Sequence, residues 1–352
     1  MDITIEKTGN KKNKPGEHEL GFGKFFTDHM FVMDYEAGKG WFDPRIVPYE
    51  SIRLDPSTSV FHYGQATFEG LKAYRDAGGK ILLFRPLDNI RRMNLSNERM
   101  SIPPIDEETA LKAIKELVRV ESEWIPDSPG TSLYIRPFVI AVDPYLGIRA
   151  SNTYKFMIIL SPVGSYYPEG INPVKIYVEY NYSRVAKGMG IAKTPGNYAA
   201  SIKAQIEAKK KGYTQVLWLD SYQKRYIEEV GSMNVFFKIG GEVVTPELNG
   251  DILDGITRRS VIELLNDWKI KCTEKKVSID ELRAAHDAGK LEESFGTGTA
   301  AVISPIGEFM INDISLKINN GMTGGLSMKL YEALTGIQTG KVNDGHGWVM
   351  EI

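Results

Sequence analysis

Two short segments carry the residue types of a reactive site. Segment 190–198 contains Lys193 and Tyr198, and segment 227–234 contains Glu229. A lysine amine forms a Schiff base only when it is neutral, so it needs partial desolvation. A phenol can donate a hydrogen bond to a ring phenolate, and a carboxylate can face a protonated ring nitrogen. These are the three groups that pyridoxal phosphate requires of a protein.

Each of these residues could instead lie on the surface. Most lysines of a soluble protein are solvated, and Glu229 could be one end of an exposed ion pair, with Glu228 as the alternative carboxylate. What sets Lys193 apart is its neighbourhood. Gly190, Pro195 and further glycines surround it in the sequence and predict an irregular turn rather than a regular helix.

The two segments resemble the lysine and glutamate motifs of branched-chain amino acid aminotransferases, which are class IV aminotransferases with fold type IV. The motif Lys-x-x-Gly-Asn-Tyr starts at Lys193, and Glu-Val-Gly-Ser-Met-Asn starts at Glu229, which favours Glu229 over Glu228. The resemblance extends over 21–348. It implies pyridoxal 5'-phosphate as the cofactor and Lys193 as the Schiff-base lysine that also acts as general base and acid.

Three further segments are expected to hold the cofactor phosphate. Arg92 matches the family arginine, although the adjacent Arg91 is an alternative. A helix expected from Ile256 offers the N–H groups of Ile256 and Thr257, which suit an anion. The glycine-rich turn 295–300 does not fit Gly-x-Gly-x-x-Gly, so a dinucleotide site is disfavoured. By resemblance, Tyr198, Ser232 and Thr299 complete the cofactor contacts, and the N–H of Ala300 faces the substrate carboxylate.

Two segments of the first half, 61–70 and 132–137, are similar to the substrate-binding segments of the family. An aromatic wall suits a branched aliphatic side chain. Arg136 could bind the second carboxylate of glutamate through charge-assisted hydrogen bonds. Phe22 and Phe68 could equally be core residues. The substrate contacts that the resemblance implies are Phe22, Tyr63, Phe68, Tyr134, Arg136 and Tyr166.

The resemblance also implies an obligate homodimer and a reaction. The loop 143–148 matches the family loop that places Leu146 and Ile148 in the pocket of the neighbouring subunit. The implied reaction moves the amino group of L-leucine, L-isoleucine or L-valine to 2-oxoglutarate in a ping-pong cycle. The products are a branched-chain 2-oxo acid and L-glutamate.

Three other functions compete with this one. A D-amino acid aminotransferase and an aminodeoxychorismate lyase share the fold, but Arg136 and the long 143–148 loop favour the branched-chain enzyme. A non-catalytic binder of phosphate ligands would be expected to lack Lys193 or Glu229, and both are present.

Apolar spacing predicts helices and short strands that alternate without a regular period. Pro86 fits the first turn of a helix, because its missing N–H would be unpaired there. Segment 107–124 has helical apolar spacing, and 199–211 reads as a solvent-facing helix. The irregular alternation favours an α+β arrangement over a doubly wound sheet. Strands are expected at 80–85, 132–140, 154–160, 215–219 and 234–238.

The length of 352 residues allows two domains, each with its own core. Segment 162–173 concentrates Pro, Gly and Asn and is the best candidate for a linker. We therefore expect a small N-terminal α/β domain at 1–164, a linker loop at 165–174 and a large cofactor-binding domain at 175–352. By resemblance, the large domain has a barrel-like sheet and the cofactor lies at the domain interface.

Composition predicts neither a nucleic-acid nor a membrane partner. The chain has 43 basic and 45 acidic residues, a net charge of −2 and no basic block. No apolar run approaches the roughly eighteen residues of a membrane span. Residues 1–17 mix acidic and basic side chains and lack the features of a signal or transit peptide, so a cytoplasmic location is expected.

Cysteine and histidine usage argues against metal and disulfide chemistry. Cys272 is the single cysteine, so no internal disulfide can form, and it is expected to pack as a small apolar residue. The five histidines include no His-x-x-x-His pair, and no metal site is expected. Mammalian members carry Cys-x-x-Cys after the glycine-rich turn. Ala301 and Ser304 stand at those positions here, so thiol regulation of that kind is not expected.

Overall fold

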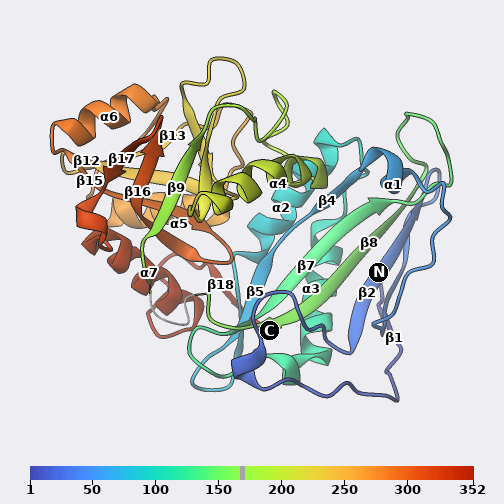
Figure 1. Ribbon diagram of the computed structural model, residues 1–352. Helices are drawn as coiled ribbons and strands as arrows, with labels where there is room; N and C mark the ends of the chain where they lie inside the picture. The colour runs from blue at the N-terminus through green and yellow to red at the C-terminus, as the bar shows by residue number, and fades with distance from the viewer. Residues whose placement is uncertain (167–170) are drawn as a thin grey trace. The chain divides into compact units, whose positions relative to one another are not determined.

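The computed structural model describes residues 1–166 and 171–352 (Figure 1). The chain forms two compact units. The first comprises Met1–Pro168, Ala192–Pro195 and Gly336–Ile352, and the second comprises Glu169–Ile191 and Gly196–Thr335. The first unit therefore includes the short segment that contains Lys193. The linker predicted at 165–174 lies partly outside the described residues, and the domain boundaries on either side of it stay predictions.

The first unit is built on a mostly antiparallel sheet. Its strands lie in the order β1-β3-β2-β8-β7-β5-β6-β18, and β4 pairs with β7. The last strand of the chain thus returns to the edge formed by β6. The bounds are β1 (Thr4–Ile5), β2 (His29–Glu36), β3 (Gly40–Pro48), β4 (Ala66–Phe68), β5 (Leu71–Arg75), β6 (Ile81–Phe84), β7 (Ser132–Ala141), β8 (Thr153–Val163) and β18 (Val349–Glu351).

Helices α2 (Pro86–Arg99) and α3 (Glu107–Val120) cover one face of this sheet (Figure 1). Asp106 caps α3 by accepting the N–H of Thr109 at 2.8 Å. One face of each strand, with Leu133 and Ile135 of β7 and Phe156 and Ile158 of β8 as examples, joins the helices in one hydrophobic core. Since successive strand residues alternate, the residues between them point to the opposite face. Three short elements complete the described part of the unit: α1 (Ser59–Tyr63) and the 3₁₀ turns Glu17–Glu19 and Ser122–Trp124.

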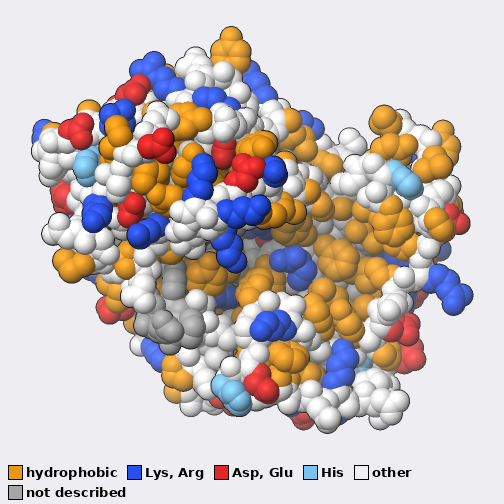
Figure 2. Space-filling model, in the orientation of Figure 1, with side chains coloured by type: hydrophobic (Ala, Val, Ile, Leu, Met, Phe, Trp, Pro, Cys, Tyr) orange, Lys and Arg blue, Asp and Glu red, His pale blue; other side chains and the backbone are white. Residues whose placement is uncertain are grey.

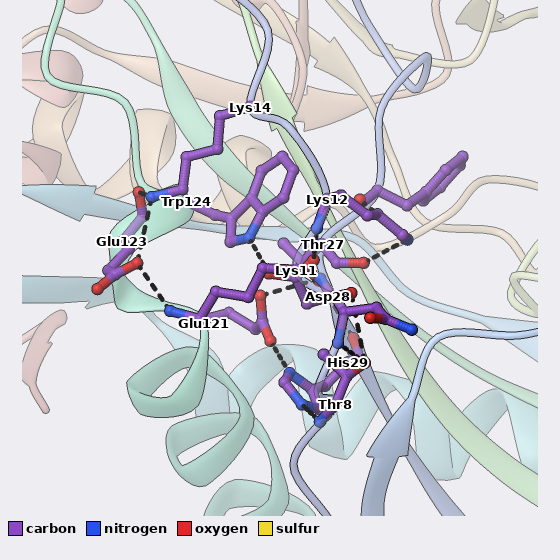
Figure 3. A network of polar contacts seen from close by, with 12 residues as sticks. Thr8, Lys11, Lys12, Lys14, Thr27, Asp28, His29, Glu121, Glu123 and Trp124 are labelled. Carbon is purple, nitrogen blue, oxygen red and sulfur yellow. Dashed lines mark hydrogen bonds and ion pairs between the residues drawn. The ribbon is translucent and has the colours of Figure 1, made fainter.

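A buried polar network ties the N-terminal segment to the first unit (Figure 3). His29 Nδ1 bonds the carboxylate of Glu121, and His29 Nε2 accepts the N–H of Thr8 at 2.9 Å. Because Nε2 accepts, Nδ1 carries the ring proton. Asp28 accepts the indole N–H of Trp124 at 3.1 Å, and burial raises the pKa of Glu121. This network fixes the start of β2.

The second unit holds the second sheet, ordered β11-β10-β9-β16-β15-β12-β13-β14, with β17 paired to β16. The sheet mixes parallel and antiparallel pairs and curls into a half-barrel. The bounds are β9 (Val174–Glu179), β10 (Gln215–Leu219), β11 (Ile227–Val230), β12 (Asn234–Ile239), β13 (Glu242–Pro246), β14 (Cys272–Lys275), β15 (Leu291–Gly298), β16 (Val302–Ile311) and β17 (Ile314–Lys317).

Four helices complete the described part of the chain: α4 (Pro195–Lys210), α5 (Ile256–Asp267), α6 (Ile279–Asp287) and α7 (Gly325–Gln338). Ala204 and Ala208 of α4 pack on Trp218 of β10, so only one narrow edge of this lysine-rich helix is buried. No helix among the described residues has the length and apolarity to cross a bilayer. Figure 2 shows acidic and basic side chains interspersed over the viewed surface.

Most predicted elements are confirmed with small shifts at their ends. The strand expected at 80–85 ends at Phe84, because Arg85 adopts a left-handed conformation with φ of 48°. The helix expected over 107–124 stops at Val120 and continues as a 3₁₀ turn. Cys272 is half-buried, and burial raises the pKa of its thiol to about 11, so the thiol stays protonated at neutral pH.

Candidate active site

Lys193 lies in an extended segment that is bonded to strand β4. The carbonyl of Lys193 accepts the N–H of Phe68 at 3.0 Å, and its own N–H donates to Ser96 Oγ at 2.9 Å. The hydroxyl of Thr194 donates to the carbonyl of Ala66 at 2.9 Å. The half-buried side chain places Nζ 4.7 Å from the centroid of the Phe68 ring. The amine is therefore fixed on an aromatic face and partly shielded from water.

Arg92 forms a buried, two-pronged ion pair with Glu69. Arg92 Nε and Nη2 donate to the two carboxylate oxygens at 2.7 and 2.9 Å, and the side chains are 6% and 1% exposed. Glu69 also accepts the Nδ2 of Asn89 at 2.9 Å and the N–H of Gly70 at 3.1 Å. Burial alone would raise the pKa of Glu69, but the charges of Arg92 and Lys193 and these hydrogen bonds lower it. Glu69 is thus an anion within the electrostatic reach of Lys193.

The neighbouring arginine has a different environment. Arg91 is exposed and pairs with Glu107 at 3.1 Å. Arg92 is therefore the one of the two that is buried close to Lys193. Glu69 engages one edge of the Arg92 guanidinium, through Nε and Nη2. A guanidinium carries five N–H donors in a fixed fork, so a carboxylate on one edge also fixes the direction of the others.

One face of the first sheet brings several predicted substrate residues together. The strand register pairs Lys72 with Tyr134 and Tyr134 with Ser161, so these three side chains form a row on the same face. Arg136, two residues beyond Tyr134, donates to the Tyr134 hydroxyl at 3.0 Å. Its guanidinium lies 5.0 Å from the centroid of the Phe68 ring. We call these five residues, Phe68, Lys72, Tyr134, Arg136 and Ser161, the site face.

The site face contains polar atoms that the protein leaves unsatisfied. Arg136 Nε and Ser161 Oγ are buried and have no hydrogen-bond partner among the described residues. Lys72 is buried, and desolvation lowers its pKa to about 8. Buried polar atoms nearly always have a partner. The site face therefore has the properties of a surface that receives polar groups of a ligand.

The remaining predicted substrate residues lie further out. Phe22 packs edge-on against Tyr134, with ring centroids 5.0 Å apart. Tyr63 ends α1 and is exposed, and Tyr166 is likewise exposed. Leu146 and Ile148 are 66% and 91% exposed in the loop 143–148.

In the second unit, Glu229 is held as a buried carboxylate on β11. It is 3% exposed, its Oε1 accepts the N–H of Leu253 at 2.9 Å, and its Oε2 lies 3.4 Å from Arg184 Nε. Arg184 also donates to the main-chain carbonyl of Asp251. The Glu229 carboxylate thus has both a cation and a backbone donor as neighbours. Glu228 is buried as well, but one of its oxygens has no partner among the described residues.

The start of α5 is shaped as an anion site. Gly255 is the N-cap and offers no side-chain cap, so the N–H groups of Ile256 and Thr257 are left for a ligand. A Cβ on Gly255 would lie 2.0 Å from the side-chain oxygen of Asn234, so only glycine fits there. The other predicted contacts lie on separate elements of this unit: half-buried Tyr198 in α4, half-buried Thr299 and Ala300 in the turn after β15, and exposed Ser232 in the turn between β11 and β12.

Comparison with known proteins identifies the family. The model of the Amino-transferase class IV family matches residues 66–309. Branched-chain-amino-acid aminotransferase 2 of Bacillus subtilis (strain 168) is 60% identical over 351 residues, which are 99% of this chain and 97% of the relative. The chain belongs to the branched-chain-amino-acid aminotransferases of class IV.

Solved structures confirm that this aminotransferase has fold type IV. The Escherichia coli branched-chain amino acid aminotransferase superposes with a TM-score of 0.76 at 25% identity, covering 92% of this chain and 98% of that one. The branched-chain aminotransferase of the thermophilic archaeon Thermoproteus uzoniensis, solved with norvaline, gives a TM-score of 0.75 at 28% identity. That match covers 92% of this chain and 99% of the other.

The motifs did not reveal four residues that lie beside predicted site residues within their own unit, namely Lys72, Ser161 and Glu69 in the first unit and Arg184 in the second. Lys72 could have been found, because it stands between the apolar residues Leu71 and Ala73 in a short strand that closely follows Phe68. Ser161, Glu69 and Arg184 carry no such signal. Their roles depend on pairings between segments that are distant in sequence, which no local pattern encodes.

Proposed function

We propose that this aminotransferase moves the amino group of L-leucine, L-isoleucine or L-valine to 2-oxoglutarate in a ping-pong cycle with pyridoxal 5'-phosphate. The observation that carries the proposal is the environment of Phe68. Its ring has the Lys193 amine 4.7 Å from its centroid and the Arg136 guanidinium at 5.0 Å. Amine chemistry and recognition of a carboxylate are thus available about one ring apart, which suits a short amino acid that carries a second acid group.

The residues of both units fit the cofactor. Lys193 supplies an amine for the aldehyde, and the buried Glu229 supplies an anion for the ring nitrogen. The uncapped helix start at Gly255, where no Cβ fits, and the guanidinium of Arg92, oriented by Glu69, suit the phosphate. The further phosphate and ring contacts that we propose are the N–H groups of Ile256 and Thr257, the hydroxyls of Ser232 and Thr299, and the phenol of Tyr198.

When bound, the cofactor supplies a protonated ring that withdraws electrons from the substrate Cα. Glu229 keeps a proton on the ring nitrogen, because its own carboxylate is held by Arg184 and the N–H of Leu253. Lys193 Nζ removes the proton from the substrate Cα and later returns one. The Phe68 ring beside the amine excludes water from this step.

Substrate selection follows from the site face. Phe22 and Phe68 offer apolar contact to a branched side chain, whereas Arg136 and the Tyr134 hydroxyl offer hydrogen bonds to the distal carboxylate of glutamate. Buried Arg136 Nε, which lacks a partner among the described residues, supports the second role. We propose that Tyr63, Tyr166 and the N–H of Ala300 complete the substrate contacts.

A homodimer is part of the proposal. Leu146 and Ile148 are large apolar residues that this chain leaves exposed, which supports their insertion into a partner's pocket. The two compact units support a division into two domains, although Ala192–Pro195 and Gly336–Ile352, which the predicted large domain at 175–352 includes, belong to the first unit. A cytoplasmic location stays a prediction from residues 1–17.

Separate half-reactions test the function. L-Leucine and L-glutamate should each convert the cofactor spectrum of the wild-type holoenzyme when added alone, and D-alanine should not. The Lys193→Ala variant should lose nearly all turnover, and borohydride should no longer attach the cofactor to the protein. A variant that still fixed the cofactor covalently would show that another lysine holds it. Conversion by D-alanine in preference to L-leucine would contradict the proposed substrate class.

A further inference from the structure

Two adjacent glutamates on β11 differ sharply in how they are satisfied. Glu228 and Glu229 are each 3% exposed, and successive strand residues point to opposite faces. Glu229 has a backbone N–H and an arginine as partners. Glu228 Oε1 has no hydrogen-bond partner among the described residues. A buried carboxylate with an unpartnered oxygen is costly to ionise, so it favours a proton.

The charges around Glu228 do not compensate for its burial. The cations that face it are Arg184 and Lys224, and the anions are Glu229, Asp251 and Asp220. Three acids thus outnumber two bases. Burial, reinforced by these acids and opposed by Arg184, raises the pKa of Glu228 to about 7.

Both cations are already engaged elsewhere. Arg184 donates to the carbonyl of Asp251 and lies 3.4 Å from Glu229. Lys224 Nζ donates to the Tyr182 carbonyl and the Ser183 hydroxyl, each at 2.7 Å. Ionised Glu228 would therefore share Arg184 with Glu229, rather than have a cation of its own.

We propose that Glu228, buried beside the Arg184–Glu229 pair, is a positioning residue that adds one negative charge there when its carboxyl loses a proton. This inference rests on the proposed function, because it takes Glu229 as the anion opposite the cofactor nitrogen. Ionised Glu228 makes the electrostatic potential at Glu229 more negative. It therefore favours the proton on the cofactor ring nitrogen that Glu229 would stabilise. Protonated Glu228 has no negative charge and does not stabilise that proton. The reaction is therefore predicted to become faster as Glu228 ionises.

The test compares the wild type with Glu228→Gln, which mimics the protonated carboxyl in shape and charge. Glu242→Gln is the control, because Glu242 is a carboxylate of the same unit paired with exposed Lys271 at the surface. The first measurement is a difference proton titration of the full-length chain, with and without cofactor. The wild type should bind one proton more than Glu228→Gln, and should release it with a midpoint near pH 7. Thermal unfolding is measured without cofactor. The Tm of Glu228→Gln relative to the wild type should be higher at pH 8 than at pH 5, because the wild type loses stability as the pH rises towards the folded-state pKa of Glu228.

The second measurement is the ratio of kcat/KM for L-leucine, wild type over variant, across pH 6 to 8. Taking a ratio cancels titrations that both proteins share. For Glu228→Gln the ratio should rise on the order of tenfold, the effect of one charge acting over about a nanometre of protein, with the same midpoint as the proton release. For Glu242→Gln the ratio should stay flat.

Two results overturn the inference. One is a proton release that is complete by about pH 5, as for an ordinary glutamate. The other is a flat kinetic ratio for Glu228→Gln in an enzyme that is active. If Glu228→Gln fails to fold, Glu228→Asp is titrated in its place. A proton release with the same midpoint as in the wild type would show that another group releases the proton, which would count against the inference. A wild type that transfers no amino group at all would instead remove the proposed function, and the role of Glu228 with it.

Discussion

The two buried glutamate–arginine pairs of this aminotransferase are built in opposite ways. In the first unit, Glu69 meets Arg92 through two parallel bonds of 2.7 and 2.9 Å, and two further donors complete its carboxylate. In the second unit, Glu229 meets Arg184 at 3.4 Å, with no hydrogen bond to Arg184 Nε among the described residues. We call the Glu69–Arg92 pair saturated, because the two residues are joined by two hydrogen bonds and Glu69 accepts two more. We call the Glu229–Arg184 pair open, because Arg184 Nε has no hydrogen-bond partner among the described residues.

This difference follows from what each pair must do. A fully bonded carboxylate keeps its charge and geometry whatever binds nearby, so Glu69 can orient Arg92 as a fixed donor. A loosely held carboxylate has bonding capacity left for a ligand, and its charge responds to neighbours such as Glu228. The saturated pair is expected to act mainly on stability and cofactor retention, and the open pair mainly on chemistry.

The largest effect should come from the open pair. Replacing Glu229 with glutamine removes the anion that holds the ring proton, and should slow the half-reaction with L-leucine by about 10²- to 10⁴-fold, the range of a lost acid–base group. Stopped-flow absorbance of the cofactor measures this rate. Cofactor should remain bound, because the phosphate contacts are untouched.

The neighbouring glutamate provides the control for that experiment. Glu228→Gln should cost at most the roughly tenfold effect of one nearby charge. If Glu228→Gln were the more damaging substitution, the anion opposite the ring would be Glu228. The comparison between the saturated and open pairs would then have to be drawn with a different carboxylate.

The saturated pair should respond through stability. Glu69→Gln leaves Arg92 buried without its anion, which typically costs about 3–5 kcal/mol of unfolding free energy. Urea unfolding of the protein without cofactor measures this cost. The matched control is Glu107→Gln, which breaks the exposed pair with Arg91 and should cost no more than about 1 kcal/mol. Equal costs for the two substitutions would show that the Glu69 pair stabilises no more than a surface ion pair does.

The contrast between the pairs also shows where sequence reasoning reached its limit. Helix α2 was predictable because Pro86 and the apolar spacing after it are local signals, and β10 was predicted with its observed ends. The sequence analysis identified no strand at β9 or β16, the central strands of the second sheet. Pro305 and Gly307 interrupt β16, and its pairing with β9 joins segments more than a hundred residues apart.

The site shows the same limit. Lys193, Arg92 and Glu229 stand in motifs, so their types and positions could be predicted, although their roles stay proposals. Glu69 lies in the predicted substrate segment 61–70 but was not itself identified, and Arg184 stands in no motif. The importance of both comes from the partner that folding brings to each. Whether a pair is saturated or open is a matter of tenths of an ångström, which no residue pattern records.

The smallest predicted effect concerns a third arginine, Arg136. Unlike Arg92 and Arg184, it has no carboxylate partner among the described residues. Its guanidinium lies 5.0 Å from the Phe68 centroid and donates to Tyr134, while its Nε has no partner among the described residues. If this open cation binds the distal carboxylate of glutamate, Arg136→Met removes a contact worth about 1.5–3 kcal/mol. The half-reaction with L-glutamate should then lose about tenfold or more in kcat/KM, and the half-reaction with L-leucine should lose less.

The comparison of the two amino acids in one variant separates recognition from packing. Methionine keeps the apolar contact of Arg136 with Phe68 but removes the charge and the donors. A loss confined to L-glutamate would show that Arg136 is an arginine left open for a ligand. Equal losses for both amino acids would mean that Arg136 orders the site face as a whole through Tyr134. Arg136 would then resemble Arg92, whose bonds to Glu69 are made within the protein, and its role in reading the carboxylate would have to be withdrawn.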